Sequence, residues 1–306
     1  MKFFTFTLSG TIFSKPVFWC SFVSCLLIVC FLFFLFLGLF LPTSPLPRSN
    51  PVDRYISVLQ EKIRYRIIEG NVPNIILLHS FGSSLEIWDP LSEYLHGQRL
   101  ISLDLIGFGR SGRPDISYQL DIQRRFLLSF MDAVNVDRAV LVGVSMGASI
   151  AAWTAAHSPN RVLACVLFAP SGYPGSMWHR WPMTMFYRPG ILNRIGQLFV
   201  VNKVFARFFP DSLARQALGV TSSYNSSFAS AISRIKQPTL LIWSHGDRRV
   251  PFSYSTVYLD EIEHSSLLER PAHVGHSVAS FAPQDTAFEI TRFLRRNKII
   301  PQSTVE

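Results

Sequence analysis

The sequence predicts an α/β fold with a mostly parallel, doubly wound sheet, a helical cap insertion and a single transmembrane helix in front of them. Short runs of aliphatic and β-branched residues alternate with longer amphipathic stretches, which is the rhythm of βαβ units. The rhythm is interrupted once, after Gly172, by roughly 60 residues, and so long a connection usually has a function. An uncharged apolar run stands near the start of the chain.

That apolar run, residues 17–41, follows a tail of residues 1–16 and is predicted to be a transmembrane helix. It contains no charged side chain over 25 residues, whereas about 20 suffice to cross the hydrocarbon of a bilayer. A cleaved signal peptide is the alternative, but its apolar part is usually about 7–15 residues long and ends in small residues. Here LPTSPLPRSNP follows. We therefore expect a single-pass anchor, and the similar positive charge on its two sides leaves the orientation open, with a slight preference for an internal N-terminus.

The rest of the chain divides into a linker, a core and an insertion. Residues 42–53 are rich in proline and predict a stiff extended linker. The core is expected over 54–172 and 236–299, and the helical cap or lid over 173–235. Strands are expected at 63–68, 74–80, 99–105, 139–144, 162–169, 239–244 and 265–270, with helices at 121–134, 148–157 and 285–296.

Composition excludes several kinds of site. Three of the four cysteines lie in the apolar run, so only Cys165 belongs to the core, where we expect a buried thiol and no disulfide. No cluster of Cys, His or carboxylate residues has the spacing of metal ligands, and no G-x-G-x-x-G follows a strand. We therefore expect neither a metal nor another cofactor.

The segment GVSMG, residues 143–147, makes Ser145 the candidate nucleophile. The pattern G-x-S-x-G is weak by itself, and the alternative is a glycine-rich turn with an idle serine. Its context strengthens it, because it follows the strand at 139–144 and precedes the helix at 148–157, the setting of a nucleophile elbow. Gly143 and Gly147 supply the lack of bulk that so sharp a turn requires.

A serine nucleophile needs a base, and the base needs a carboxylate that orients it. In this kind of fold the acid and then the histidine follow the serine along the chain. Asp247 follows the strand at 239–244, and the alternative for it is an ordinary turn residue. His276 follows the strand at 265–270. His273 competes with it, and we favour His276 because Gly275 lets the backbone approach Ser145 closely.

Five segments in this order, HSFGSS, DLIGFGRS, GVSMG, WSHGDRRVP and GHS, resemble the α/β-hydrolase superfamily in its carboxylesterase and lipase-like branch. The resemblance covers about residues 63–296. It implies an oxyanion hole made by the amides of Phe81 and Met146, and a structural role for Asp104. Ser80 stands where the family usually has glycine. Because Ser145 occupies the position of the nucleophile, the resemblance disfavours the branches that use an aspartate there, haloalkane dehalogenases and epoxide hydrolases.

These features predict a membrane-anchored serine hydrolase that cleaves carboxylic esters, with a small-molecule ester or a lipid as its substrate. Acyl transfer, C–C bond hydrolysis and peroxidation on the same fold remain alternatives, as does a catalytically inactive membrane adaptor.

The predicted cap also carries charge, with seven basic residues against Asp211, interleaved with aromatic side chains. This mixture suits an anionic lipid surface, and a solvated cap with inward-facing aromatics is the alternative. We expect membrane lipid and not nucleic acid as the partner, and the oligomeric state stays open.

Overall fold

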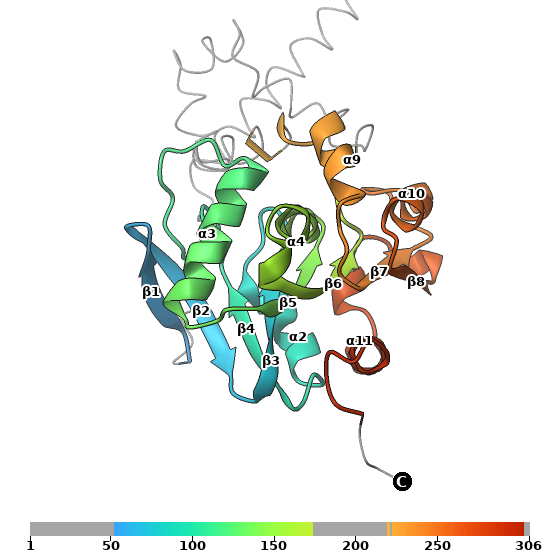
Figure 1. The fold of residues 1–306 in the computed structure, drawn as a ribbon, viewed down its shortest axis with the longest axis horizontal. Coiled ribbons are helices and arrows are strands. Elements are labelled where there is room, and N and C mark those ends of the chain that lie inside the picture. Colours follow the sequence, from blue (N-terminus) through green and yellow to red (C-terminus); the bar gives the residue numbers. More distant parts are fainter. Residues whose placement is uncertain (1–51, 174–218, 221, 303–306) are drawn as a thin grey trace, which may run out of the picture.

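The computed structural model describes residues 52–173, 219–220 and 222–302 (Figure 1). The predicted tail, anchor and nearly all of the linker lie outside this part, as do residues 174–218 of the predicted cap. Among the described residues, no helix has the length and apolar character needed to cross a membrane.

An eight-stranded sheet forms the centre of the molecule, in the order β1-β2-β4-β3-β5-β6-β7-β8. β1 pairs with β2, and β2 with β4, in antiparallel fashion, while every other neighbouring pair is parallel. The mostly parallel sheet of the prediction is therefore confirmed. The strands are β1 Arg54–Val58, β2 Glu61–Ile68, β3 Asn71–Leu78, β4 Gln98–Leu103, β5 Ala139–Val144, β6 Val162–Phe168, β7 Thr239–Ser244 and β8 Ser265–Arg270.

The first strand, β1, is missing from the prediction. It forms an antiparallel hairpin with β2 through a turn at Leu59 and Gln60, whose φ angles are 49° and 68°. In a sequence, glycine or asparagine usually indicates a turn with positive φ, and this turn contains neither residue. Most of β1 is exposed at the edge of the sheet, so its sequence lacks the apolar pattern of a buried strand.

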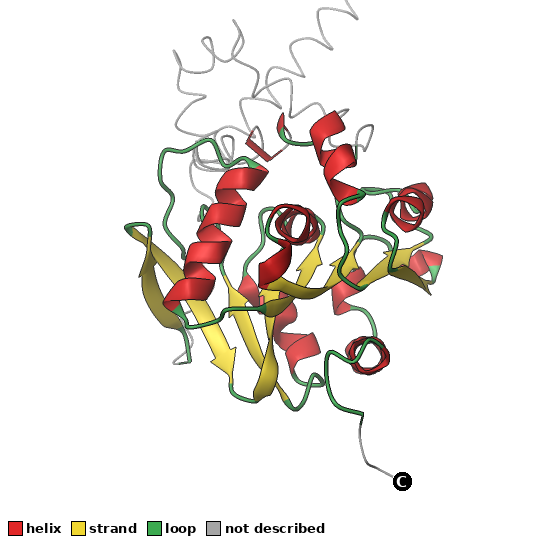
Figure 2. Cartoon of the chain, in the orientation of Figure 1, coloured by secondary structure: helices red, strands yellow, loops and turns green. Residues whose placement is uncertain are grey.

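Helices cover both faces of the sheet (Figures 1 and 2). α3 (Leu120–Ala133) and α4 (Met146–His157) lie on one face, and α2 (Asp89–Ser92) and α11 (Pro283–Arg296) lie on the other. The other helical elements of the described residues are η1 Leu85–Trp88, η2 Pro159–Arg161, α9 Ser226–Ile232, α10 Ser253–Glu261, η4 Ala272–Val274 and η5 Val278–Ser280. This is the doubly wound arrangement that the alternation of patterns predicts.

α9 falls inside the range predicted as cap, yet it packs against the core helix α4. The rings of Phe228 on α9 and Trp153 on α4 are stacked with their centroids 6.2 Å apart. The C-terminal end of the predicted cap range therefore contributes to the core.

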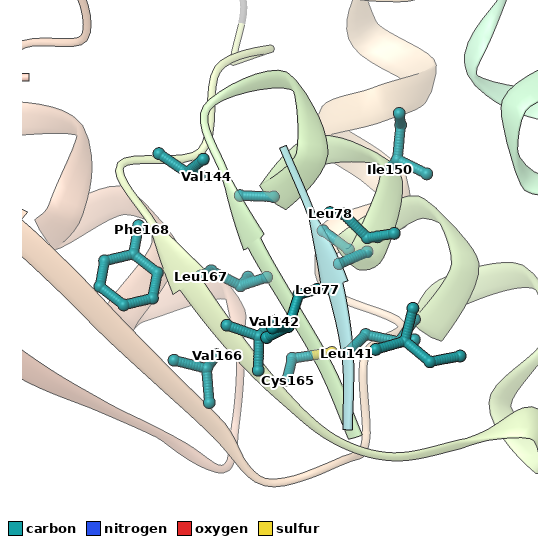
Figure 3. Close-up of a cluster of buried hydrophobic side chains, with 14 of the residues drawn as sticks. Leu77, Leu78, Leu141, Val142, Val144, Ile150, Cys165, Val166, Leu167 and Phe168 are labelled. Carbon is teal, nitrogen blue, oxygen red and sulfur yellow. The ribbon is translucent and has the colours of Figure 1, made fainter. Parts of the chain in front are cut away.

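The three central strands β3, β5 and β6 supply the middle of the core (Figure 3). Leu77, Val142 and Val166 are fully buried there. Cys165 is free and buried as expected, and burial raises the pKa of its thiol to about 12. Both faces of these strands are covered, and this rigid platform carries the loops at the carboxyl ends of β3, β5, β7 and β8.

A buried ionic network supports the loop that follows β4. The guanidinium of Arg64 is fully buried and lies 3.1 Å from Asp104, and it also contacts Asp53 and Glu86. Burial opposes its charge, but the hydrogen bond to Glu86 and the nearby carboxylates raise the pKa of Arg64 overall. Asp104 in turn accepts the backbone N–H groups of Leu85 and Arg110, at 2.8 Å each. The structural role expected for Asp104 agrees with these contacts.

Candidate active site

Ser145 sits at the sharp turn between β5 and α4. Its φ of 54° and ψ of −113° are strained values for a residue with a side chain, and such strain persists only where the surroundings impose it. The N–H of Ser145 donates to the carbonyl of Phe168 at the end of β6, over 2.8 Å. The N–H of Ser149 donates back to the Ser145 carbonyl at 3.0 Å. The backbone on both sides of the hydroxyl is thus fixed.

The two glycines that flank this turn are required by close backbone approach. A Cβ at Gly147 would overlap the carbonyl oxygens of Leu78 and His79 at the end of β3. A Cβ at Gly143 would overlap the carbonyl group of Gly147. The strand and the helix can therefore meet at this angle only if both positions lack a side chain.

Asp247 and His276 are brought together at the same edge of the sheet. Asp247 follows β7 and His276 follows β8, and the carboxyl ends of neighbouring parallel strands lie side by side. Nδ1 of His276 lies 2.7 Å from Oδ2 of Asp247. Oδ1 of the same carboxylate accepts the backbone N–H groups of Arg249 at 2.8 Å and Val250 at 2.9 Å. A carboxylate only accepts, so the proton lies on Nδ1 and leaves Nε2 of the neutral ring free to act as a base.

Backbone constraints let the histidine loop pass close to the acid loop. Gly275 has a φ of +56°, which favours glycine, and it directly precedes His276. Gly246 precedes Asp247, and a Cβ there would overlap the carbonyl of Ala272. His273, the competing histidine, is exposed and packs edge-on against Phe281, with 5.5 Å between ring centroids. The structure therefore pairs His276, and not His273, with Asp247.

One cavity adjoins the candidate base and the strand that ends at the candidate nucleophile. His276 lines a cavity together with Val144, the residue directly before Ser145. Among the described residues, no hydrogen bond joins the Ser145 hydroxyl to the imidazole. Catalytic hydrogen bonds are often long in a free enzyme and tighten when substrate binds.

The loop after β3 is held by His79, a residue for which the sequence predicts no such role. Nε2 of His79 accepts the N–H of Leu105 at 3.0 Å, so the proton must be on Nδ1, which donates to the carbonyl of Ser80 at 2.7 Å. Burial lowers the pKa of His79, which keeps the ring neutral. In a trans peptide the N–H of Phe81 points opposite to the Ser80 carbonyl, so His79 fixes the direction of the amide expected in the oxyanion hole.

The second expected donor, the N–H of Met146, belongs to the first residue of α4. The first N–H groups of a helix have no partner inside it, and they carry a partial positive charge. Met146 therefore offers an amide beside Ser145 that the helix itself does not use.

A cluster of buried hydroxyl groups supports the turn at Ser145. Tyr224, just before α9, lies 2.7 Å from the hydroxyl of Ser171, and Ser149 of α4 hydrogen-bonds to Ser171. Burial raises the pKa of Tyr224 to about 12, so its hydroxyl keeps its proton. No short motif marks this cluster, because its members lie far apart along the chain.

Residues 73–208 match the model of the alpha/beta hydrolase fold family. This chain belongs to the α/β-hydrolase superfamily. The resemblance read from its five sequence segments is thereby confirmed at the level of the superfamily.

Known relatives of this α/β hydrolase differ in their reactions. A haloalkane dehalogenase of Agrobacterium fabrum is 35% identical over 107 residues, and the match covers 35% of either chain. The 2-hydroxy-6-oxo-6-(2'-aminophenyl)hexa-2,4-dienoic acid hydrolase of Metapseudomonas resinovorans is 26% identical over 83% of this chain and 95% of its own. A crystal structure of a serine hydrolase involved in carbazole degradation aligns with a TM-score of 0.62 and 26% identity, over 80% of this chain and 99% of the other.

Proposed function

We propose that this α/β hydrolase is a serine hydrolase that cleaves carboxylic esters through an acyl-enzyme, with Ser145 as nucleophile, His276 as base and Asp247 as the acid. The observation that carries the proposal is the His276–Asp247 contact of 2.7 Å at the sheet edge where the strained elbow presents Ser145.

In the first half of the reaction, Nε2 of His276 takes the proton of the Ser145 hydroxyl as the oxygen attacks the ester carbonyl. The tetrahedral intermediate collapses as the carbonyl reforms, the ester C–O bond breaks, and His276 returns the proton to the leaving alcohol. In the second half, water attacks the acyl-enzyme with the same base, and the products are a carboxylic acid and free Ser145.

The oxyanion that forms in each half would be bound by the amides of Phe81 and Met146. Two donors held in place before the reaction stabilise developing charge more than they stabilise a neutral carbonyl. The hydrogen bonds of His79 to Leu105 and Ser80 support this assignment, since they fix the plane of the Ser80–Phe81 peptide.

C–C bond hydrolysis is the second candidate, and the extensive match to the dienoic acid hydrolase of Metapseudomonas resinovorans favours it. The same residues could serve both reactions, because both pass through attack on a carbonyl. We do not propose the dehalogenase reaction for this chain, because that branch uses an aspartate as nucleophile and Ser145 occupies the position here.

We further propose that residues 17–41 anchor the enzyme in a membrane, which would bring the site close to lipid esters. The support is the length and uncharged character of that run, together with the proline-rich linker after it. A lipid-like acyl group is the substrate class that fits such a position.

The test is a profile of kcat/KM for p-nitrophenyl esters from acetate to dodecanoate, measured beside the dienoic acid substrate of the relative. An ester hydrolase for acyl chains should show kcat/KM rising to at least hexanoate or octanoate, because each buried methylene is worth about 0.8 kcal/mol. A peak at acetate would reject a long acyl pocket. Turnover of the dienoic acid alone would favour C–C hydrolysis.

A further inference from the structure

A cavity of about 440 Å³ opens beside His276, and its wall comes from the ends of several strands. Its lining residues belong to the loops after β3, β7 and β8, to η1 and to the end of β5. They include Ser80, Arg248, Arg249, His276, Ser277 and Ser280. Since Val144 also lines it and precedes Ser145, the cavity adjoins the proposed reaction centre.

The charge on this wall is positive. Arg248 and Arg249 contribute two guanidinium groups, and the residues that line the cavity include no aspartate or glutamate. Within the described ranges, neither arginine side chain forms an ion pair. Asp247 is adjacent in sequence, but its side chain is fully buried and its oxygens already accept from His276 and two backbone amides. It therefore does not supply a carboxylate to the cavity.

Polar and apolar groups share the rest of the wall. Hydroxyl groups of Ser80, Ser277 and Ser280 can donate to an oxygen anion. Ile87, Val144 and Val274 add apolar surface on which a short hydrocarbon segment can lie. Guanidinium groups bind carboxylate and phosphate through paired hydrogen bonds, and such charge-assisted bonds are stronger than neutral ones.

We infer that this cavity binds an anionic oxygen group, a carboxylate or a phosphate, that the substrate carries a few bonds away from the scissile carbonyl. The inference rests on the proposed function, because it takes Ser145 and His276 as the reaction centre. Arg248 and Arg249 act here as specificity residues: they select esters with a negative charge on the side of the histidine loop.

The kinetic test compares matched esters on the full-length chain in nonionic detergent. For carboxylate the pair is mono-4-nitrophenyl adipate and 4-nitrophenyl hexanoate, with spontaneous hydrolysis subtracted. For phosphate the pair is oleoyl lysophosphatidic acid and monooleoylglycerol, with zwitterionic oleoyl lysophosphatidylcholine as a further reference. The measured quantity is the ratio of kcat/KM, anionic over neutral, in the wild type, Arg248→Gln/Arg249→Gln and Arg248→Lys/Arg249→Lys.

We expect one of the two ratios to be about tenfold or more in the wild type and to fall close to one in the glutamine variant, given the strength of charge-assisted hydrogen bonds. The lysine variant should keep part of the preference. Arg125→Gln, which changes an exposed arginine on α3 away from the cavity, should leave the ratio unchanged. The pair that responds identifies carboxylate or phosphate. Ratios near one for both pairs, or ratios that the glutamine variant does not alter, would overturn the inference.

A binding measurement separates this inference from the proposed chemistry. Calorimetric titration with hexylphosphonate and with hexanoate reports anion binding whether or not any ester is hydrolysed. Weaker binding to the glutamine variant than to Arg125→Gln would support the anion site even if Ser145 proved inactive toward esters. Equal binding to both variants, or no binding to the wild type, would reject the site while leaving hydrolysis of neutral esters as a separate result.

Discussion

The carboxylate of Asp247 holds the imidazole of His276, and two backbone amides hold the carboxylate itself. The distance from Nδ1 to Oδ2 is 2.7 Å, and the amides of Arg249 and Val250 lie within 2.9 Å of Oδ1. This arrangement fixes both the orientation and the tautomer of the ring.

Asp247→Asn should lower kcat by about 10³–10⁴-fold with little change in the fold, because the amide favours the wrong tautomer of His276. The measurement is ester hydrolysis by purified protein, with circular dichroism to check folding. Asp260→Asn, at an exposed position on α10, is the control and should retain activity. Full activity of the Asp247→Asn variant would contradict the assignment of Asp247 as the acid that orients His276.

His276→Ala should abolish nearly all ester hydrolysis, since the nucleophile and its base act as one unit. The matched control is His273→Ala, three residues earlier in the same loop, whose side chain is exposed against Phe281. That variant should keep most of the wild-type kcat/KM. The reverse outcome, an inactive His273 variant and an active His276 variant, would exchange the two roles.

Gly147→Ala should destabilise the protein by about 3 kcal/mol or more, because its Cβ would overlap backbone carbonyls that cannot move aside. Gly97→Ala is a useful comparison: its φ is +92°, but a Cβ there meets nothing within 4 Å. It should cost only about 1–2 kcal/mol for the unfavourable conformation. Urea unfolding of both variants measures the difference, and equal losses would argue against steric overlap at the elbow.

Burial lowers the pKa of His79 below its usual value of 6.5, which gives stability a pH dependence. As the pH falls below 6.5, the unfolded chain binds a proton at this residue while the folded chain does not. Stability is therefore complete above pH 6.5 and is lost below it, until the lower pKa of the folded state is reached. The loss from one such proton is at most about 1.4 kcal/mol per pH unit.

The check is urea unfolding between pH 7.5 and 5.0 for the wild type and His79→Gln. His157 also has a pKa lowered by burial and contributes in both proteins, so the difference between the two slopes isolates His79. The variant should show the shallower slope. Identical slopes would mean that His79 gains a proton in the folded protein as readily as in the unfolded chain.

Removal of residues 1–50 should yield a soluble protein with esterase activity, because every candidate catalytic residue and all eight strands of the described sheet lie after that point. Hydrolysis of a small soluble ester by the truncated protein is the measurement. A well-folded but inactive product would mean that the apolar segment takes part in the site.

Much of the fold could be predicted because its signals are local. The central strands are continuous apolar runs, and β5 is buried at every position. The sequence therefore predicts the alternation of strands and helices. The edge strand β1 and helix α10 were not predicted. β1 is largely exposed, and α10 lacks a distinct apolar face, having only Ser255 and Tyr258 buried.

In the candidate site, too, residues with a local sequence signal could be predicted and residues that depend on distant contacts could not. Ser145, Asp247 and His276 could be proposed because each follows a recognisable strand. The supporting residues could not, since their roles arise from contacts across the fold: His79 reaches Leu105, Tyr224 reaches Ser171, and Arg64 reaches Asp104. From the sequence alone, a buried arginine on a strand near the edge of the sheet cannot be distinguished from an exposed one.

Reaction with a fluorophosphonate probe tests the central claim most directly, because the probe forms a covalent bond only with an activated serine. The full-length protein should be labelled stoichiometrically, peptide mapping should locate the adduct on Ser145, and Ser145→Ala should not react. Absence of labelling in folded wild-type protein, or an adduct on another serine, would contradict the assignment of Ser145 as nucleophile.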